Sequence, residues 1–420
     1  MAVTGDTILK AYPLAWYRFI GQATTGMGLP AHTINLEETS MKPAISRLLA
    51  AFVPLMYALC ASAVDPGISS DSILIGQTGV FSGPVAEPSL QYRAGAQLYF
   101  DAVNAKGGIH GRKIKLLSYD DKFDPKLAAE NARKLLVEDK VFTLFGLIGT
   151  GATAASMPLV SEHRIPVVGS LSGSDGLRDP KLKLLFHTRA SYSDETGKMV
   201  EQLNSTGVKS IAVVYQDDAF GKAGLKSAQG AFERQGVKPA IEASIDMNKL
   251  EALGPTVDKV KQTQPGAIIM VTAGKASTAF IREYLKTGQR PQFFGVSVLS
   301  AKALLGELGS AAHGIVIAQV VPSPLRTSYG ISKEFLAAAK KSDSKDVTYN
   351  SLEGYLTAKV FVEALRRAGK DLSRDKLFTA LESLNNIDLG GFIVDYSSGK
   401  RAGSSFVDLS IISKTGQFLH

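Results

Sequence analysis

Short, fully apolar segments alternate with segments of helical periodicity along the chain from about residue 70 onward. In "SIAVVY" (210–215) and "AIIMVTA" (267–273) nearly every position is apolar, which is typical of strands buried on both faces of a parallel sheet. Between such runs, "DPKLAAENARKLL" (124–136) predicts a helix with Asp124 as its N-cap and Pro125 in its first turn. This alternation predicts an α/β fold built from βαβ units with right-handed crossovers. The expected strands cover residues 73–80, 113–118, 141–148, 166–169, 210–215, 267–272, 293–296 and 314–321.

The strands are too many for one ordinary sheet, and the alternating pattern restarts near Arg189. A chain of 420 residues is long enough for two or three domains. We therefore expect two doubly wound parallel-sheet lobes, with the helices around 350–369 and 374–384 packing back on the first lobe. The expected limits are 71–188 plus about 322–402 for lobe 1, and 189–321 plus about 403–420 for lobe 2.

Charge and reactive residues argue against several classes of function. The 47 basic and 39 acidic residues are interspersed, without the basic block typical of nucleic-acid binding. One cysteine, Cys60, allows neither an internal disulfide nor a cysteine-based zinc cluster, and the six histidines lack metal-binding spacing. No catalytic triad order or nucleophile elbow is present. We expect a protein that is not an enzyme, requires no cofactor or metal and binds no nucleic acid.

Residues 41–63 have the order of a secretory signal peptide: a short positive region, an apolar run and the small residues Ala-Ser-Ala at 61–63. The apolar run is short for an uncleaved membrane anchor, which is the alternative. We expect cleavage that leaves Val64 as the first residue, and a periplasmic protein. Residues 1–40 resemble neither a signal nor a domain, so Met41 is the expected start and 1–40 a mis-assigned upstream extension.

Small, polar and glycine-rich loops follow the expected strands. In open α/β sheets, ligands bind at these carboxyl ends, so two lobes could hold a ligand in a cleft between them. The loop "GTGAT" (149–153) could cradle a phosphate or a carboxylate, or could be only a structural turn. A dinucleotide site needs an acidic residue at the end of the next strand, where Gly169 and Ser170 stand instead, and no lysine completes a phosphate-binding loop.

Two acidic groups have a structural and a functional interpretation. Asp120, Asp121 and Asp124 could bind a cation, but they lack the calcium-loop spacing, and a strand end followed by a helix cap explains them. Asp217 and Asp218 could be paired catalytic carboxylates, although a turn and lobe-closure hydrogen bonds are the simpler reading.

Segments 104–136, 146–178, 189–199 and 213–225 resemble the branched-chain amino-acid binding proteins, which are type I periplasmic substrate-binding proteins of ABC transporters. The resemblance implies two α/β lobes joined by three crossovers. It implies an exported monomer that captures a small organic ligand, an amino acid or another small carboxylate or amide, in the cleft between its lobes. Delivery to an ABC permease in the inner membrane would follow. The alternative is a ligand-sensing receptor of the same fold that regulates a signalling partner.

The resemblance also assigns residues to the ligand site. Thr150, Ser172 and Gly173 would hold the ligand's carboxylate, Ser82 would line the floor, and aromatic residues would close over the ligand. The full predicted set is Ser82, Ile148, Gly149, Thr150, Leu171, Ser172, Gly173, Tyr192, Phe220 and Ser297.

One position departs from the family's pattern. Amino-acid binders place a carboxylate near Ser297 to pair with the ligand's ammonium group, and this chain has a serine there. A buried ammonium without a counter-charge costs several kcal/mol. Either another acid supplies the charge, or the ligand is not an α-amino acid. The candidate acids are Asp194, Asp217, Asp218 and Glu353.

Overall fold

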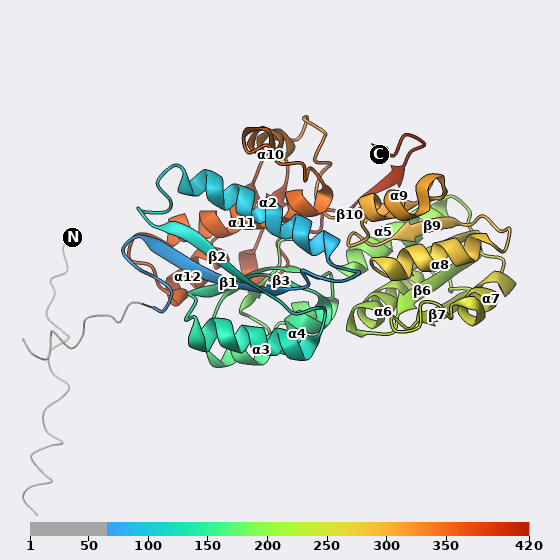
Figure 1. Ribbon diagram of the computed structural model, residues 1–420, viewed down its shortest axis with the longest axis horizontal. Helices are drawn as coiled ribbons and strands as arrows, with labels where there is room; N and C mark the ends of the chain where they lie inside the picture. Colours follow the sequence, from blue (N-terminus) through green and yellow to red (C-terminus); the bar gives the residue numbers. More distant parts are fainter. Residues whose placement is uncertain (1–64, 420) are drawn as a thin grey trace, which may run out of the picture. The chain divides into compact units, whose positions relative to one another are not determined.

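The computed structural model describes residues 65–419 (Figure 1). The extension expected at 1–40, the signal peptide expected at 41–63 and Cys60 lie outside the described residues. Over 65–419, no helix is long and apolar enough to span a bilayer. The same residues contain no group of three or more His, Cys, Asp or Glu side chains arranged to hold a metal ion.

The first sheet has five parallel strands in the order β2-β1-β3-β4-β5. Helices α2 and α11 cover one of its faces, and α3 and α4 cover the other (Figure 1). Both faces are therefore apolar: in β3, Phe145 packs toward α2 and α11, whereas Leu144 and Leu147 pack toward α3 and α4. The strands are β1 (Ser72–Gly79), β2 (Lys113–Asp120), β3 (Thr143–Ile148), β4 (Val167–Leu171) and β5 (Leu185–Phe186).

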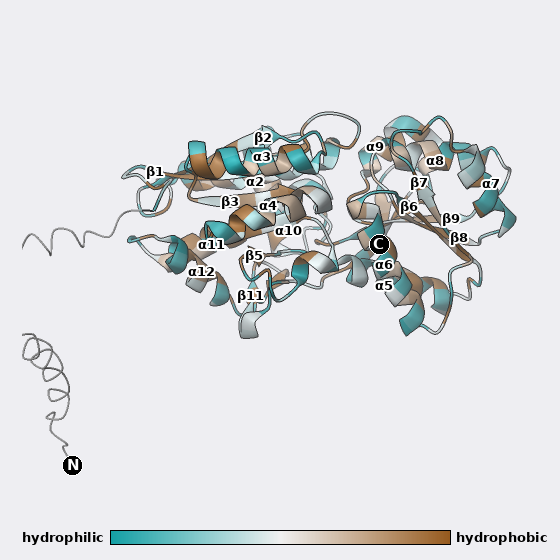
Figure 2. Ribbon diagram, turned by 90° about the horizontal axis from the view of Figure 1, so that it is seen from below, coloured by the Kyte–Doolittle hydropathy of each residue, from teal (hydrophilic) through white to brown (hydrophobic). Residues whose placement is uncertain are grey.

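The second sheet has seven strands in the order β14-β13-β10-β9-β8-β6-β7. The five strands from β10 to β7 are parallel, and β13 and β14 extend the sheet as an antiparallel edge. Its central strands are mostly apolar, and β8 is apolar throughout, while the outer faces of the helices are hydrophilic (Figure 2). The strands are β6 (Ile211–Gln216), β7 (Ile241–Ile245), β8 (Ala267–Val271), β9 (Gln292–Gly295), β10 (Val316–Gln319), β13 (Asp408–Ile412) and β14 (Phe418–Leu419).

The chain passes between the two sheets three times. The first crossover joins β5 to α5, the second joins β10 to α10, and the third runs from the hairpin of β11 (Ile387–Asp388) and β12 (Ile393–Val394) to β13. This is the fold expected from the sequence: two α/β lobes connected by a three-segment hinge. We refer to the parts built on the first and second sheets as the first and second lobes.

The helices follow the expected positions closely. Asp124 caps α3 by accepting a hydrogen bond from the Lys126 amide at 2.8 Å, with Pro125 as the first helical residue, and a π-helical turn (Lys134–Glu138) continues it. Helix α11 packs along α2 of the first lobe. The helices are α2 (Glu87–Asn104), α3 (Pro125–Arg133), α4 (Thr150–Glu162), α5 (Tyr192–Ser205), α6 (Ala219–Arg234), α7 (Gly254–Gln262), α8 (Lys275–Leu285), α9 (Ala301–Leu308), α10 (Gly330–Lys341), α11 (Tyr349–Ala368) and α12 (Arg374–Glu382).

Candidate functional site

A small cavity of about 40 Å³ lies where the carboxyl ends of strands from both sheets meet. Residues at or after the carboxyl ends of β1, β2, β3, β4, β6, β8 and β9 surround it, together with Tyr192 at the start of α5. Six residues of the predicted set line it: Ile148, Gly149, Thr150, Leu171, Tyr192 and Phe220. The other lining residues are Val80, Val85, Pro88, Ser89, Phe123, Ala273 and Val298.

The Thr150 hydroxyl lines one side of this cavity, and the Ser172 hydroxyl is its hydrogen-bond partner, although Ser172 is not itself a lining residue. The Oγ atoms of Thr150 and Ser172 lie 2.8 Å apart, and both side chains are buried. The Ser174 amide donates to the Ser172 Oγ at 3.2 Å. One of the two hydroxyl protons is used in the bond between Thr150 and Ser172, and the other is available to a ligand.

Backbone geometry adds donors to these hydroxyls. Gly149 adopts a φ of +93°, which only glycine tolerates readily, and this turns the chain from β3 directly into α4. No side chain caps this helix, so its first amide groups have no intrahelical acceptor and carry the positive end of the helix dipole. Hydroxyls and free amides at one point form a suitable cradle for a carboxylate.

Tyr192 and Phe220 form the aromatic wall of the cavity. Their rings meet edge to face with centroids 5.6 Å apart, and both side chains are buried. Burial raises the pKa of the Tyr192 phenol, so its hydroxyl stays protonated at neutral pH. Phe220 comes from the first turn of α6 in the second lobe, so this aromatic pair closes the cavity from that side.

Apart from Ser89 the remaining walls are apolar, and no charged side chain lines the cavity. Val80 and Val85 come from the loop after β1, whereas Ala273 and Val298 come from the second lobe. The sequence analysis missed these residues because small apolar side chains beside a strand look like ordinary core. Their position directly after strand ends is the signal that could have identified them.

None of the four candidate acids supplies a carboxylate to this cavity. Asp194 belongs to the capping box of α5, and Asp218 caps α6 by accepting from the Gly221 amide at 2.8 Å. Asp217 is exposed and pairs with Lys222 at 2.8 Å. Glu353 faces the crossover instead, in the charge cluster described next.

Arg189, in the first crossover, is fully buried between two carboxyl groups. Its guanidinium lies 2.9 Å from Glu195 of α5 and 3.4 Å from Glu353 of α11, so it connects the two lobes. Burial raises the pKa of Glu353 to about 7. Burial alone would lower the pKa of Arg189, but the carboxylates of Glu353 and Glu195 raise it above its ordinary value.

Ser297 belongs to this charge cluster and not to the lining of the small cavity. Its amide donates to Glu195 at 2.7 Å, and its hydroxyl contacts both Glu195 and Arg189. The carboxylate beside Ser297 is therefore Glu195, which Arg189 already neutralises. The sequence analysis missed Arg189 and Glu195, although both are charged residues within the crossover motif "RASYSDETGKM".

The two remaining predicted residues, Gly173 and Ser82, are not among the residues that line the small cavity. Gly173 lies beside the cradle, where its carbonyl accepts from the Tyr192 amide at 2.6 Å; an added Cβ would come within 2.4 Å of the Tyr192 ring. Ser82 lies outside the small cavity, donates to Asp120 and lines an open groove with Asp217 and Asp218.

The lobes touch at several points around the cavity. Ser300 donates to Glu87 at 2.7 Å, and Ser227 donates to Asp175 at 2.7 Å. The Cα of Gly274 faces the Pro84 carbonyl so closely that a Cβ there would lie 2.2 Å from its oxygen. The structure therefore has its lobes closed over the cavity.

Comparison with known proteins agrees with this architecture. The sequence profile of the periplasmic binding protein family matches residues 72–407. A Leu/Ile/Val-binding protein homolog from Brucella abortus is 24% identical over 332 residues, which cover 74% of this chain and 82% of the relative.

Two crystal structures show the same fold at higher identity. A substrate-binding periplasmic protein from Ralstonia solanacearum is 32% identical, has a TM-score of 0.77 and covers 83% of this chain and 99% of its own. A possible leucine/isoleucine/valine-binding protein from Rhodopirellula baltica is 29% identical, has a TM-score of 0.78 and covers 86% and 98%. Members of the family bind amino acids or other small ligands, work with ABC transporters and are not enzymes. With the family profile spanning both lobes and all three crossovers, this chain belongs to the periplasmic binding protein family, as a type I substrate-binding protein related to the Leu/Ile/Val-binding proteins.

Proposed function

We propose that this protein captures a small organic carboxylate with an uncharged, apolar body in the cavity between its lobes, and delivers it to an ABC permease. The observation that carries the proposal is the division of the cavity into two sides. Thr150, hydrogen-bonded to Ser172, and the start of α4 offer hydrogen-bond donors on one side, and apart from Ser89 apolar and aromatic side chains form the rest. We also propose that it acts as a monomer, with the lobe limits given in the sequence analysis.

The absence of a free carboxylate from the cavity lining narrows the class of ligand. A free α-amino acid would bring its ammonium group into a space without an acidic side chain among the described residues. Because burying an unpaired charge costs several kcal/mol, the cavity favours acids without an amino group. Aromatic acids and short branched-chain acids fit this description.

The size of the cavity implies that the lobes move during binding. A volume of about 40 Å³ lies far below the range of about 300–1,000 Å³ that is typical of sites for small organic molecules. The lobes must therefore separate to admit the ligand and then close around it. Such hinge motion is a common form of ligand-linked domain closure.

A thermal-shift screen tests the proposed ligand class. The panel contains free amino acids, aromatic acids, short-chain acids and the primary amides of those acids. A ligand at a hundredfold excess over its Kd stabilises the folded protein by about 2.7 kcal/mol. We expect the unfolding temperature to rise with one or more acids. Stabilisation by free amino acids alone would contradict the proposal that the ligand carries no charge apart from its carboxylate.

A sensory role is the second candidate, because the same fold can regulate a signalling partner. The genetic neighbourhood separates the two roles. Permease and ATPase genes beside this gene would support transport, and a kinase or antiterminator gene would support sensing.

Replacing Thr150 with valine should weaken ligand binding by about ten- to a hundredfold, because a hydrogen bond to a charged group contributes about 1.5–3 kcal/mol. Valine keeps the shape of the side chain, and the backbone donors of α4 remain, so binding should persist at the lower affinity. Titration calorimetry with the acid found in the screen measures the change.

Thr153→Val is the matched control for this substitution. Thr153 lies one turn further along α4, is buried and pairs its hydroxyl with Ser170 at 2.9 Å, but does not line the cavity. Its replacement should leave the Kd within about threefold of the parent, since it removes no contact with the ligand. If both substitutions changed the Kd equally, Thr150 would affect binding only by maintaining the loop, and not by contacting the ligand.

Export gives a separate prediction. We propose that the segment at residues 41–63 is a cleaved signal peptide, so the mature protein should begin at Val64. N-terminal sequencing of protein from the periplasmic fraction tests this directly. Mature protein that retains residues 1–40 would contradict both the cleavage site and the proposed start at Met41.

A further inference from the structure

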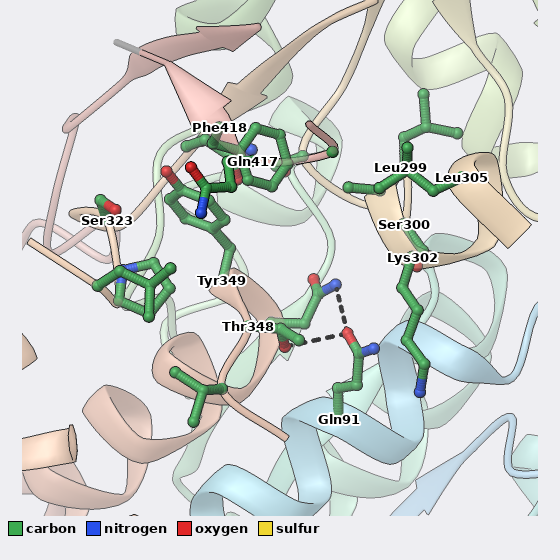
Figure 3. A pocket seen from close by; sticks show the side chains of 18 of the residues that line it. Gln91, Leu299, Ser300, Lys302, Leu305, Ser323, Thr348, Tyr349, Gln417 and Phe418 are labelled. Carbon is green, nitrogen blue, oxygen red and sulfur yellow. Dashed lines mark hydrogen bonds between the residues drawn. The ribbon is translucent and has the colours of Figure 1, made fainter. Parts of the chain in front are cut away.

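A second and much larger cavity, of about 620 Å³, lies beside the second crossover (Figure 3). It shares no lining residue with the small cavity. Helix α2 borders both cavities, with Pro88 and Ser89 in the small one and Gln91 in the large one. Its volume falls in the range of sites for small organic molecules, about 300–1,000 Å³. Its lining residues are Gln91, Ser297, Leu299–Ala301, Lys302, Leu305, Gln319, Ser323–Arg326, Val347–Asn350 and Gly416–Phe418.

Apolar and aromatic side chains form two opposite walls of this cavity. Tyr349 and Phe418 lie on one side, with ring centroids 5.2 Å apart in an edge-to-face arrangement. Leu299, from the segment before α9, and Leu305, from the middle of α9, lie on the other side in Figure 3. A flat or branched apolar group would fit between these walls, because both offer carbon surface.

A buried amide closes the cavity from the first lobe. Gln91 is 4% exposed, and its side-chain carbonyl accepts hydrogen bonds from Thr348 at 3.1 Å and Asn350 at 3.2 Å. These bonds, drawn in Figure 3, fix the orientation of the amide. The polar groups are therefore held in place by the protein before any ligand arrives, which lowers the cost of ordering them on binding.

The charge of the lining is positive. Lys302 and Arg326 are charged lining residues, and no acidic residue is among them. Glu87 lies nearby, with its carboxylate 3.7 Å from the Lys302 ammonium, while Arg326 forms no ion pair with the residues that the structure describes. Two cations beside apolar walls favour an amphipathic anion over a neutral or cationic molecule.

Both lobes contribute to the cavity. Gln91, Thr348 and Asn350 come from helices of the first lobe, whereas α9 and the C-terminal hairpin belong to the second. Ser300, which lines the large cavity, joins the lobes by its hydrogen bond to Glu87. A molecule in the large cavity would contact both lobes in this closed arrangement and would therefore favour closure.

We propose that the large cavity is a second binding site, which takes an amphipathic organic anion with an aromatic or branched apolar body and thereby favours closure of the lobes. This site goes beyond the proposed function, because it uses none of the residues of the small cavity. Its existence can be tested without knowing the ligand of the small cavity.

The probe for this site is 8-anilinonaphthalene-1-sulfonate, an aromatic sulfonate that is far too large for a 40 Å³ cavity. We expect its fluorescence to saturate at one molecule per chain. Lys302→Glu combined with Arg326→Glu should weaken its binding at least about tenfold, since two favourable charges become unfavourable ones.

Lys181→Glu combined with Lys238→Glu is the matched control. It changes the net charge equally, at two exposed lysines that do not line the large cavity, and it should leave probe binding within about twofold. Thr150→Val should also leave probe binding unchanged, because Thr150 belongs to the small cavity.

Three results would overturn the proposal. The first is equal probe binding by the Lys302/Arg326 variant and the parent. The second is loss of probe binding in Thr150→Val. The third is probe fluorescence that appears only when the near-ultraviolet circular dichroism is lost, because the dye then reports exposed core and not a formed site.

Discussion

Gly274→Ala should weaken ligand binding by about ten- to a hundredfold, because the added methyl group leaves no room for the lobes to close. Its Cβ would lie 2.2 Å from the Pro84 carbonyl oxygen and 2.9 Å from a Val85 methyl group, both across the cleft in the first lobe. Separation of the lobes would relieve this clash, so the substitution acts against closure. Titration calorimetry with the identified acid measures the loss of affinity.

The same substitution also strains the backbone at Gly274. A matched control at Gly309 separates the effect of this strain from the effect of the clash between the lobes. Gly274 has φ +52° and ψ −132°, and Gly309 at the end of α9 has nearly the same angles, φ +54° and ψ −126°. A Cβ at Gly309 would meet no atom within 4 Å. Gly309→Ala should therefore lose a similar amount of stability but bind the ligand normally. Equal loss of affinity in both variants would show that strain, and not closure, explains the effect.

Arg189→Met should lower the free energy of unfolding by about 3–5 kcal/mol, which is the usual cost of removing one partner of a buried ion pair. The substitution leaves Glu195 and Glu353 buried without a cation beside them, and it removes the link between α5 and α11. Urea denaturation followed by circular dichroism measures the change. A loss under about 1 kcal/mol would mean that the cluster is dispensable for stability.

Arg367→Met provides the comparison at a partly exposed site. Arg367 pairs with Glu363 at 2.9 Å one turn away on α11, and both side chains are about one-third exposed. The exposed pair contributes roughly 0.3–0.5 kcal/mol and the hydrogen bond that Arg367 also donates to the Ser383 carbonyl about 1 kcal/mol, so this variant should lose clearly less stability than Arg189→Met. The difference between the two arginines then reports the burial of the Arg189 cluster.

Most of the fold could be predicted from the sequence because the central strands of both sheets are buried on both faces. The continuous apolar run of β8 predicts a strand buried on both faces, and Asp124 with Pro125 marks the start of α3. The strands missed were those without that signal. β7 alternates exposed and buried residues at the edge of its sheet, and β13 is only partly buried beside the opposite edge. The other missed strands, β5, β11, β12 and β14, are two residues long.

The candidate site could be predicted only in part. The loops that hold Thr150 and Ser172 follow strands directly, and their small polar residues made them visible. The charge cluster was not visible, because Glu195 and Ser297 are 102 residues apart and meet only in the folded chain. For the same reason, neither the absence of a free carboxylate from the small cavity nor the positive lining of the large one could be seen before the lobes were assembled.

In the proposed function, the ligand is held by its carboxylate group at the Thr150 and Ser172 hydroxyls. Titration calorimetry of the acid found in the thermal-shift screen, beside its own primary amide, tests this most directly, because the two molecules differ only in the charged group. A charged hydrogen-bond acceptor gains about 1.5–3 kcal/mol at such a site, so we predict that the amide binds at least about tenfold more weakly than the acid. An amide that binds as tightly as its acid would contradict the carboxylate cradle.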